Sequence, residues 1–372
     1  MRIAVVATGG FHPSGREQVV PSWGALFSRL AHTHDIHVFV LRHLQEAHTY
    51  RLLGFTVHDL GRPAAPFGLT RLAQEQALYR ALTLNGPFDL IHGLWGDPAG
   101  QLAVRMGRAC HLPSIVTFDS GEFVSLPEIE YGSQRSARGR SAIAEAAQAA
   151  GIHVCSRFMA AKAERFHLRP TVIPLTTVTA STPRRESART GSLRLIQVAS
   201  LSKVKNQGML IDAVALLAAS IDIHLDLVGE DTLDGQLQQH ARGAGVAERV
   251  SFHGFVPQDD LPPRYAAADA YVQSSLHEAA GVSVLEASAA GLPVVGTRAG
   301  YLADWSADRA IAVDDFKPGS LAQAVLRLRD DPERTRQMAS RAQAWAITND
   351  AMSIVDRFLE LYERAARATS AS

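Results

Sequence analysis

The chain has 372 residues, of which 47% are hydrophobic and 20% are charged, enough for two or three domains with separate cores. Its 37 Lys and Arg residues balance its 37 Asp and Glu residues, and this neutrality argues against a dedicated DNA-binding protein. Two cysteines, Cys110 and Cys155, are too few for a disulfide framework or a four-cysteine zinc site.

In the first 178 residues, short β-rich runs alternate with longer stretches of helical period, a pattern typical of βαβ units on a parallel sheet. A helix is expected over 19–30, and strands are expected over 2–8, 35–41, 55–59, 89–92, 114–118, 151–155 and 171–174. This part has 17 basic and 13 acidic residues, a net charge of +4. The excess reflects either chance surface composition or contact with an anionic partner.

Segment 179–192 contains a proline and few apolar residues, so we expect a linker. Further strands are expected over 193–200, 224–229, 250–253, 270–274, 293–297 and 310–313, and helices over 207–219, 235–244, 261–267, 282–290 and 321–330. Within 351–372, apolar residues recur at helical spacing, which predicts an amphipathic helix packing on either domain. The expected fold is therefore α/β, with two Rossmann-like, doubly wound domains, 1–178 and 193–350, facing each other across a cleft.

The segment HEAAGVSVLEASAAGLPVVGTRAG at 277–300 contains two spaced glutamates, Glu278 and Glu286. Eight residues of continuous helix rise about 12 Å, whereas the paired carboxylates of glycoside hydrolases lie roughly 5–9.5 Å apart. A break at Gly281 would shorten the separation and direct a loop glutamate and a helix glutamate toward one pocket. The alternative is a solvated Glu278 and an ordinary helical Glu286, and the spacing alone leaves both interpretations open.

Two neighbouring segments, VASLSKVKNQ at 198–207 and VSFHGFVPQDDLPPRYAAADAY at 250–271, give these glutamates a context. Together the three segments resemble the C-terminal half of the retaining GT-B glycosyltransferases of family 4. The E-x7-E element of that family corresponds to Glu278 and Glu286, and its G-x-L-x-x-x-K loop corresponds to Leu201 and Lys205. Weaker matches extend the resemblance over nearly the whole chain: Gly9-Gly10, FDLIHG at 88–93, LPSIVTF at 112–118 and VIP at 172–174.

The resemblance implies a GT-B enzyme that moves a sugar from a nucleotide-diphosphate donor to an acceptor hydroxyl with retention of the anomeric configuration. Lys205 would contact the diphosphate as a compact cation, Glu278 the hydroxyls of the transferred sugar, and Glu286 the ribose diol. The other expected donor-binding residues are Gly281, Val282 and Ser283 at a helix start, His253, Gly254 and Phe255 in the base-holding loop, Ser200, and Gly10. Relatives often have a basic residue where this chain has Ser200. His253 is better interpreted as an ordinary loop histidine than as a catalyst.

The N-terminal domain is expected to bind the acceptor, with Asp119 as its catalytic candidate. Relatives usually have a histidine here that contacts the donor sugar; aspartate keeps the capacity to accept hydrogen bonds but changes charge and reach. Gly9, Trp95, Glu122 and Arg138 are the other acceptor-side candidates. A plain turn, simple packing and a solvated arginine are the alternatives for Gly9, Trp95 and Arg138.

The sequence contains no D-x-D triplet, and the resemblance predicts a reaction that needs no metal and no cofactor beyond its UDP- or GDP-linked sugar substrate. The acceptor would be a saccharide, a lipid-linked molecule or a small molecule, and nucleic acid is not an expected partner. No apolar run reaches the roughly 20 residues of a membrane span. We therefore expect a cytoplasmic protein, with segment 64–72 leaving weak peripheral contact with the inner face of a membrane open. The rival functions are a non-catalytic nucleotide-sugar-binding homologue and a GT-B epimerase or phosphorylase.

Overall fold

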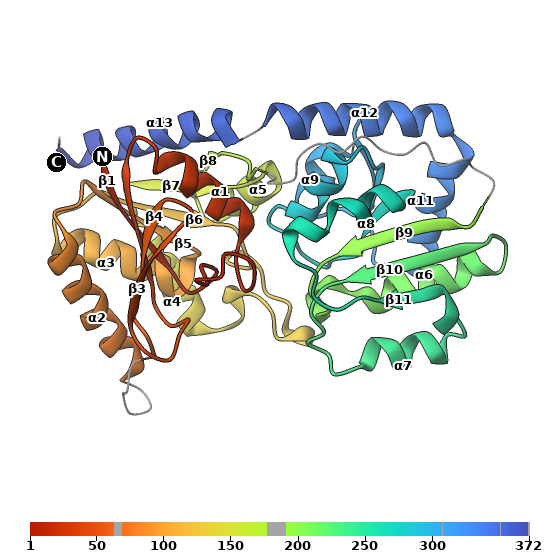
Figure 1. Ribbon diagram of the computed structural model, residues 1–372, viewed down its shortest axis with the longest axis horizontal. Helices are drawn as coiled ribbons and strands as arrows, with labels where there is room; N and C mark the ends of the chain where they lie inside the picture. Colours follow the sequence, from red (N-terminus) through yellow and green to blue (C-terminus); the bar gives the residue numbers. More distant parts are fainter. Residues whose placement is uncertain (63–68, 177–190, 307, 350, 371–372) are drawn as a thin grey trace. The chain divides into compact units, whose positions relative to one another are not determined.

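The computed structural model describes residues 1–62, 69–176, 191–306, 308–349 and 351–370 (Figure 1). Its contacts divide the chain into two compact units. Residues 1–176 and 351–372 form the first, here called domain 1, and residues 177–350 form the second, domain 2. Most of the predicted linker, and residues 64–68 of the segment considered for membrane contact, lie outside the described residues.

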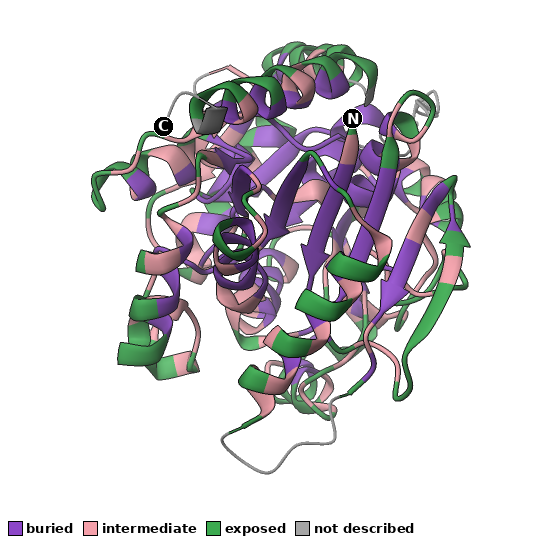
Figure 2. Ribbon diagram, turned by 90° about the vertical axis from the view of Figure 1, so that its left-hand side faces the viewer, coloured by how far each residue is buried: buried purple, intermediate pink, exposed green. Residues whose placement is uncertain are grey.

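Domain 1 is built on an eight-stranded sheet. Its strands are β1 (Arg2–Ala7), β2 (Asp35–Val40), β3 (His48–Leu52), β4 (Phe55–Asp59), β5 (Leu90–Leu94), β6 (Ser114–Phe118), β7 (Gly151–Val154) and β8 (Thr171–Val172). They pair in the order β3-β4-β2-β1-β5-β6-β7-β8, and only β3 runs antiparallel to its neighbour. Every residue of β5 and β6 is buried, as is typical of central parallel strands, whereas β3 at the edge is largely exposed (Figure 2).

Six α-helices belong to the described part of domain 1: α1 (Pro21–Leu30), α2 (Thr70–Asn85), α3 (Gln101–Ala109), α4 (Ala137–Ala146), α5 (Arg157–Glu164) and α13 (Ala351–Ser370). The last of these follows domain 2 in the chain yet packs on α1, β6 and β7. Its Phe358 is fully buried against the ring of Trp23, and Arg357 donates a hydrogen bond to the carbonyl of Val172 at 2.5 Å. The amphipathic pattern predicted this helix but left open which domain it covers.

Domain 2 contains a six-stranded, fully parallel sheet in the order β11-β10-β9-β12-β13-β14. The strands are β9 (Leu193–Val198), β10 (Ile223–Val228), β11 (Val250–Phe252), β12 (Ala270–Gln273), β13 (Val294–Thr297) and β14 (Ala310–Val313). The α-helices described in it are α6 (Gln207–Ala218), α7 (Gln236–Gly243), α8 (Pro262–Ala267), α9 (Val282–Ala289), α10 (Tyr301–Trp305), α11 (Pro318–Asp330) and α12 (Pro332–Thr348).

Both sheets are doubly wound, because the chain adds strands on one side of the first strand and then crosses to the other side. The order reverses between β1 and β5 in domain 1 and between β9 and β12 in domain 2. In open α/β sheets, ligands bind beyond the carboxyl ends of the strands at such a switch point. The loops after β1, β5, β9 and β12 are therefore where functional side chains should lie.

The sequence analysis missed β3, α10 and α12, and it gave no bounds for α2 to α5, which fall within its stretches of helical period. The sequence of β3, HTYRL, has a single buried residue, so it carries no alternation of apolar and polar residues. In α12 the buried side chains include Ala339, Ala342 and Ala346, whose small size gives little apolar periodicity. All the expected strands are present, with ends that differ by at most two residues. None of the described helices is both long and apolar enough to cross a membrane.

Candidate active site

Lys205 lies at the switch point of domain 2, in a short 3-10 turn (Lys203–Lys205) that follows β9. Its ammonium group donates to Oε1 of Glu278 at 2.5 Å. The backbone of the turn is fixed to the loop after β12, because Ser274 Oγ donates to the carbonyl of Lys205 at 2.7 Å and the amide of Leu276 donates to that of Val204 at 2.8 Å. Lys205 and Glu278, which are 73 residues apart in the sequence, thus form an ion pair at the carboxyl ends of the neighbouring strands β9 and β12.

Glu278 belongs to the loop between β12 and α9 and also accepts a hydrogen bond from Ser275 Oγ at 2.7 Å. Gly281 ends this loop with φ of 85°, and a Cβ atom there would lie 2.9 Å from Oε1 of Gln273. Glycine is therefore required at this turn for its positive φ and its close approach to Gln273. Since α9 begins at the next residue, the chain does break at Gly281, leaving Glu278 in a loop and Glu286 in a helix.

Glu286 projects from α9 into the interior and is only 4% exposed. Its Oε2 accepts a hydrogen bond from the hydroxyl of Tyr265 at 2.7 Å, and its Oε1 accepts one from Nε2 of Gln258 at 2.7 Å. Burial raises the pKa of this carboxyl above its ordinary value, and the two hydrogen bonds oppose that rise. These two partners were not singled out from the sequence, since neither residue type carries chemistry that marks it.

Val282 and Ser283 form the first turn of α9, where backbone N–H groups lack acceptors within the helix and the macrodipole favours an anion. Ser283 Oγ lies 2.7 Å from the hydroxyl of Tyr271 on β12, which ties this helix start to the central sheet. Ser200, in the loop after β9, is exposed, and its carbonyl accepts a hydrogen bond from Gln207 at 3.0 Å. A serine at this point supplies hydrogen-bonding capacity but no positive charge.

The loop after β11 contains His253, Gly254 and Phe255. His253 is held on both ring nitrogens, because Arg264 donates to its Nδ1 at 3.0 Å while its Nε2 lies 2.6 Å from Oδ1 of Asp226. Because Arg264 donates to Nδ1, the proton is assigned to Nε2, which donates to Asp226. His253 thus links β10 to α8 through its two ring nitrogens. The carbonyl of Gly254 accepts from the amide of the residue after β10 at 2.8 Å, and Phe255 is 52% exposed. Phe255 is thus the accessible side chain of the three.

In domain 1, Asp119 immediately follows β6. Nε1 of the fully buried Trp23 donates to its Oδ2 at 3.1 Å, and its Oδ1 is buried without a hydrogen-bond partner among the described residues. Burial, followed by the nearby charge of Glu122, raises the pKa of Asp119 to about 8. An aspartate that favours its protonated form differs from the histidine of relatives in hydrogen-bonding character as well as in length.

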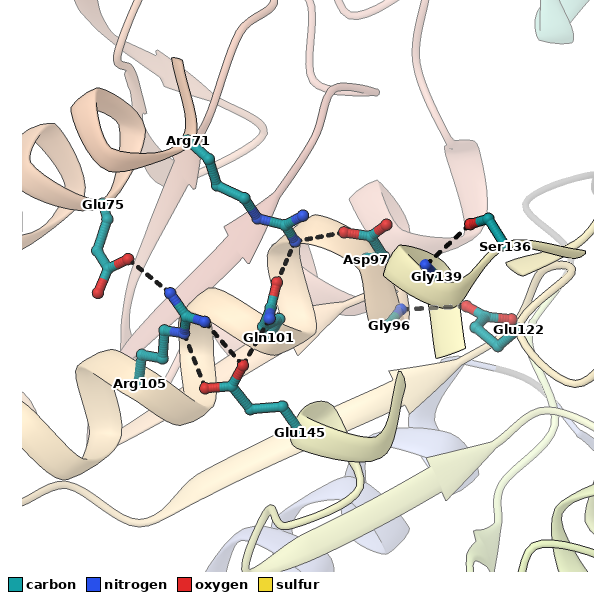
Figure 3. A network of polar contacts seen from close by, with 10 residues as sticks. All are labelled: Arg71, Glu75, Gly96, Asp97, Gln101, Arg105, Glu122, Ser136, Gly139 and Glu145. Carbon is teal, nitrogen blue, oxygen red and sulfur yellow. Dashed lines mark hydrogen bonds and ion pairs between the residues drawn. The ribbon is translucent and has the colours of Figure 1, made fainter. Parts of the chain in front are cut away.

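Glu122 is also buried, at 2% exposure, and its carboxylate accepts hydrogen bonds from the amides of Ser120 at 2.8 Å and Gly96 at 3.2 Å. The Glu122 side chain therefore braces the loop after β5 from one side, as Figure 3 shows. On the other side, Arg71 of α2 pairs with Asp97. Glu122 contacts this backbone in the described structure, so its first role is to shape the loop.

Trp95 begins the loop held by these contacts. It has φ of 67°, a left-handed conformation that a bulky residue adopts only at a cost, and it is partly exposed. Behind the loop, the guanidinium of Arg105 in α3 binds Glu75 at 2.9 Å and Glu145 at 2.7 Å (Figure 3). Gln101 of α3 joins the two ends of this network by donating to Glu145 and accepting from Arg71.

The remaining candidates of domain 1 are the acceptor-side residues Gly9 and Arg138 and the donor-side candidate Gly10. Gly9 and Gly10 follow β1 and are partly exposed; the carbonyl of Gly10 accepts from the amide of Val20 at 2.9 Å. Arg138 is exposed in the first turn of α4. Within the described ranges, no group of three or more His, Cys, Asp and Glu side chains has an arrangement that could hold a metal ion.

Two family models match the chain. The Glycosyl transferase 4-like domain matches residues 19–176, and Glycosyl transferases group 1 matches residues 180–345. The D-inositol 3-phosphate glycosyltransferase of Paenarthrobacter aurescens is 26% identical over 312 residues, which cover 77% of this chain and 75% of that protein. The likeness to known glycosyltransferases thus extends over both domains.

Among solved structures, sucrose-phosphate synthase of Thermosynechococcus elongatus superposes with a TM-score of 0.80 at 19% identity, and both chains are fully covered. Anabaena HepE in complex with UDP and glucose superposes with a TM-score of 0.75 at 19% identity, covering 97% of this chain and 98% of that one. These likenesses concern the fold, and they confirm the predicted GT-B architecture of two parallel α/β domains. With a glycosyltransferase model matched on each domain, the chain belongs to the group 1 glycosyltransferases of the GT-B fold.

Proposed function

We propose that this glycosyltransferase moves a sugar from a nucleotide-diphosphate donor to an acceptor hydroxyl, with retention at the anomeric carbon and without a metal ion. The donor binds at the switch point of domain 2. The observation that carries the proposal is the ion pair between Lys205 and Glu278 at 2.5 Å. Glu278 lies in the loop that leads into α9. A cation, a sugar-binding carboxylate and a helix start then meet where an open α/β sheet binds its ligand.

The diphosphate gains negative charge as the sugar departs, and groups already oriented toward it lower the barrier. Lys205 supplies a full positive charge, while the backbone N–H groups of Val282 and Ser283 supply the partial charge of a helix N-terminus. Ser200 adds a hydrogen bond where relatives have a cation, so leaving-group stabilisation rests chiefly on Lys205. This arrangement supports a reaction that remains active in excess EDTA.

The rest of the donor is bound by groups that suit its chemistry. Glu278 accepts hydrogen bonds from the hydroxyls of the transferred sugar, and Glu286 accepts them from the ribose diol. Phe255, half exposed in the loop after β11, provides an aromatic face for the base, with Gly254 giving the base close access and His253 holding the loop. The donor base is uracil or guanine, and the complex of Anabaena HepE with UDP and glucose supports uracil.

The acceptor binds at the carboxyl edge of the sheet in domain 1, beside Asp119. Gly9 and Trp95 follow β1 and β5 at this edge, and Glu122 shapes the loop after β5. Arg138, an exposed arginine in the first turn of α4, would bind a phosphate on the acceptor. The name of the Paenarthrobacter relative, a D-inositol 3-phosphate glycosyltransferase, supports a phosphorylated polyol among the saccharide, lipid-linked and small-molecule acceptors considered.

Retention proceeds on one face of the sugar. The bond from the anomeric carbon to the diphosphate oxygen breaks while the acceptor oxygen bonds to the same face, and the departing phosphate oxygen takes the acceptor's proton. The described site offers no separate nucleophile beside Glu278, whose carboxylate is already bound to Lys205 and Ser275. Product NMR should therefore show a linkage of the same anomeric configuration as the donor, and an inverted product would refute this stereochemistry.

The decisive experiment measures sugar transfer by Lys205→Ala and Glu278→Gln. Each should lower kcat by about 10²–10³-fold, the usual effect of removing one preorganised charge-stabilising group. Lys317→Ala and Glu248→Gln remove an exposed lysine and an exposed glutamate of the same domain and should keep full activity. Rates near wild type for both site variants would contradict the assignment.

A non-catalytic homologue is the second candidate, favoured by Ser200 and Asp119, which depart from the residues usual in relatives. Such a protein would bind a nucleotide sugar and show a thermal shift, about 2.7 kcal/mol of stabilisation at 100 times the dissociation constant. It would show no transfer above the background of Glu278→Gln with any acceptor. Release of free nucleotide only when an acceptor is present would instead separate transfer from epimerase or phosphorylase chemistry.

A further inference from the structure

Glu286 is a buried carboxyl group, and both of its side-chain hydrogen-bond partners are neutral groups. The hydroxyl of Tyr265 binds one oxygen and the amide of Gln258 binds the other, each at 2.7 Å. Neither of these two hydrogen-bond partners carries a positive charge. Both donors come from a single segment between β11 and β12, which also carries the loop of Phe255.

These two hydrogen bonds fix the direction of the carboxylate and favour its ionised form. Burial alone would push the pKa of Glu286 upward and favour a protonated acid, which donates as well as accepts. With one donor bound to each oxygen, the group cannot rotate freely about its terminal torsion, and both oxygens are held as acceptors toward these donors. An ionised carboxylate has about four lone-pair sites, so two remain for other donors.

Tyr265 is suited to this task because it is rigid. It is fully buried in α8, and its ring has only two side-chain torsions to fix. Gln258 lies in the 3-10 turn before α8 (Gln258–Asp260) and is partly exposed. The buried hydroxyl therefore sets the position of Glu286, and the amide links that position to the neighbouring base loop.

We propose that Tyr265 and Gln258 are positioning residues that hold the Glu286 carboxylate for the ribose diol and thereby make the donor site select ribose over 2′-deoxyribose. This inference rests on the proposed function, in which Glu286 binds the ribose. A hydroxyl lost from the ligand leaves a fixed, buried acceptor without its partner, whereas a carboxylate free to turn or to protonate tolerates the loss. Selectivity, more than affinity, is what the two residues confer.

The test compares the affinities of UDP and 2′-deoxy-UDP, and of GDP and 2′-deoxy-GDP, by calorimetry with the full chain. For whichever base binds, wild type should prefer the ribonucleotide by roughly tenfold to a hundredfold, the range for a hydrogen bond to a charged group. In Tyr265→Phe and in Gln258→Leu this ratio should fall at least fivefold. Tyr79→Phe and Gln239→Leu, which change an exposed tyrosine and an exposed glutamine away from these contacts, should keep the wild-type ratio.

The outcomes separate the inference from the function on which it rests. If wild type binds no nucleoside diphosphate, the proposed function fails. If wild type binds and discriminates while both variants keep its ratio, the positioning role is wrong although Glu286 can still bind ribose. If wild type binds the ribonucleotide and the 2′-deoxyribonucleotide equally, the inference is overturned, while the proposed role of Lys205 is unaffected. Gln258→Leu, at the partly exposed partner, keeps the test available should the buried Tyr265→Phe fold poorly.

Discussion

Tyr362→Phe is expected to destabilise domain 1, because it removes the first donor of a buried relay. Tyr362 of α13, His92 of β5, Thr117 of β6 and His153 of β7 are all fully buried. The Tyr362 hydroxyl lies 2.9 Å from Nδ1 of His92, whose Nε2 lies 2.8 Å from Thr117 Oγ1. That oxygen lies 2.9 Å from Nδ1 of His153, whose Nε2 faces the carbonyl of Ile173 at 2.8 Å.

The carbonyl at the end of the relay sets its direction. A carbonyl only accepts, so Nε2 of His153 carries the proton, and burial lowers the pKa of this histidine to about 4 and keeps the ring neutral. Thr117 must then donate to His153 and accept from His92, which leaves Nδ1 of His92 as an acceptor. Tyr362 is its donor, and phenylalanine leaves that nitrogen buried without one.

An unsatisfied buried acceptor costs about 1–3 kcal/mol, and full burial of all four side chains places the expected loss in this range. Hydrogen exchange is the suitable assay, since it reports each domain separately. Amides of β5, β6 and β7 should exchange roughly 5- to 150-fold faster in Tyr362→Phe than in wild type. Tyr79→Phe, at a 47% exposed tyrosine, should stay within about 0.5 kcal/mol of wild type. Equal rates in the two variants, or equal acceleration in β9 and β10, would refute the reasoning.

Two further predictions concern stability. Burial lowers the pKa of His92 to about 3 and that of His153 to about 4. Between these values and pH 6.5, protons bind these histidines in the unfolded chain only, so the free energy of unfolding falls as the pH is lowered. At pH 5 each histidine should lower the free energy of unfolding of domain 1 by about 2 kcal/mol. Denaturant unfolding at pH 7.5 and pH 5 measures this, and equal midpoints would contradict it. Gly229→Ala should destabilise domain 2 by about 1–3 kcal/mol or more, because φ there is 152° and the new Cβ would lie 2.0 Å from the carbonyl oxygen of Ala199. Gly319→Ala, with open space, is its control; equal melting temperatures for the two variants would count against the clash.

The residues proposed to bind the donor could be predicted from local sequence patterns. A strand, a polar turn and a helix recur in each half, and parallel sheets bring the carboxyl ends of strands to one edge, so Lys205 and Glu278 could be expected together. Gly281 also predicted the break between loop and helix, since few other residue types adopt its positive φ. Motif order along the chain then named the family.

The acceptor side was less accessible from the sequence, because its features depend on what surrounds each residue. Asp119 was identified as a departure from relatives, but its raised pKa comes from burial and from Glu122, and its partner Trp23 lies 96 residues away. Trp95 gave no sign in the sequence of its positive φ. Glu122, a proposed acceptor-side residue, also accepts a hydrogen bond from the amide of Gly96, a contact that no local pattern indicates.

What the sequence determined by itself was the fold class, the order of most elements and the residues proposed to bind the donor, since periodicity, turn residues and motif spacing are all local signals. Tertiary structure alone decided which side chains hold Glu286, that α13 returns to domain 1, and that Tyr362 reaches His92 across 270 residues of chain. An amphipathic helix fits any apolar surface, and a buried polar group takes whichever partner the packing brings within 3 Å. Those pairings follow from topology, and no pattern over neighbouring residues encodes them.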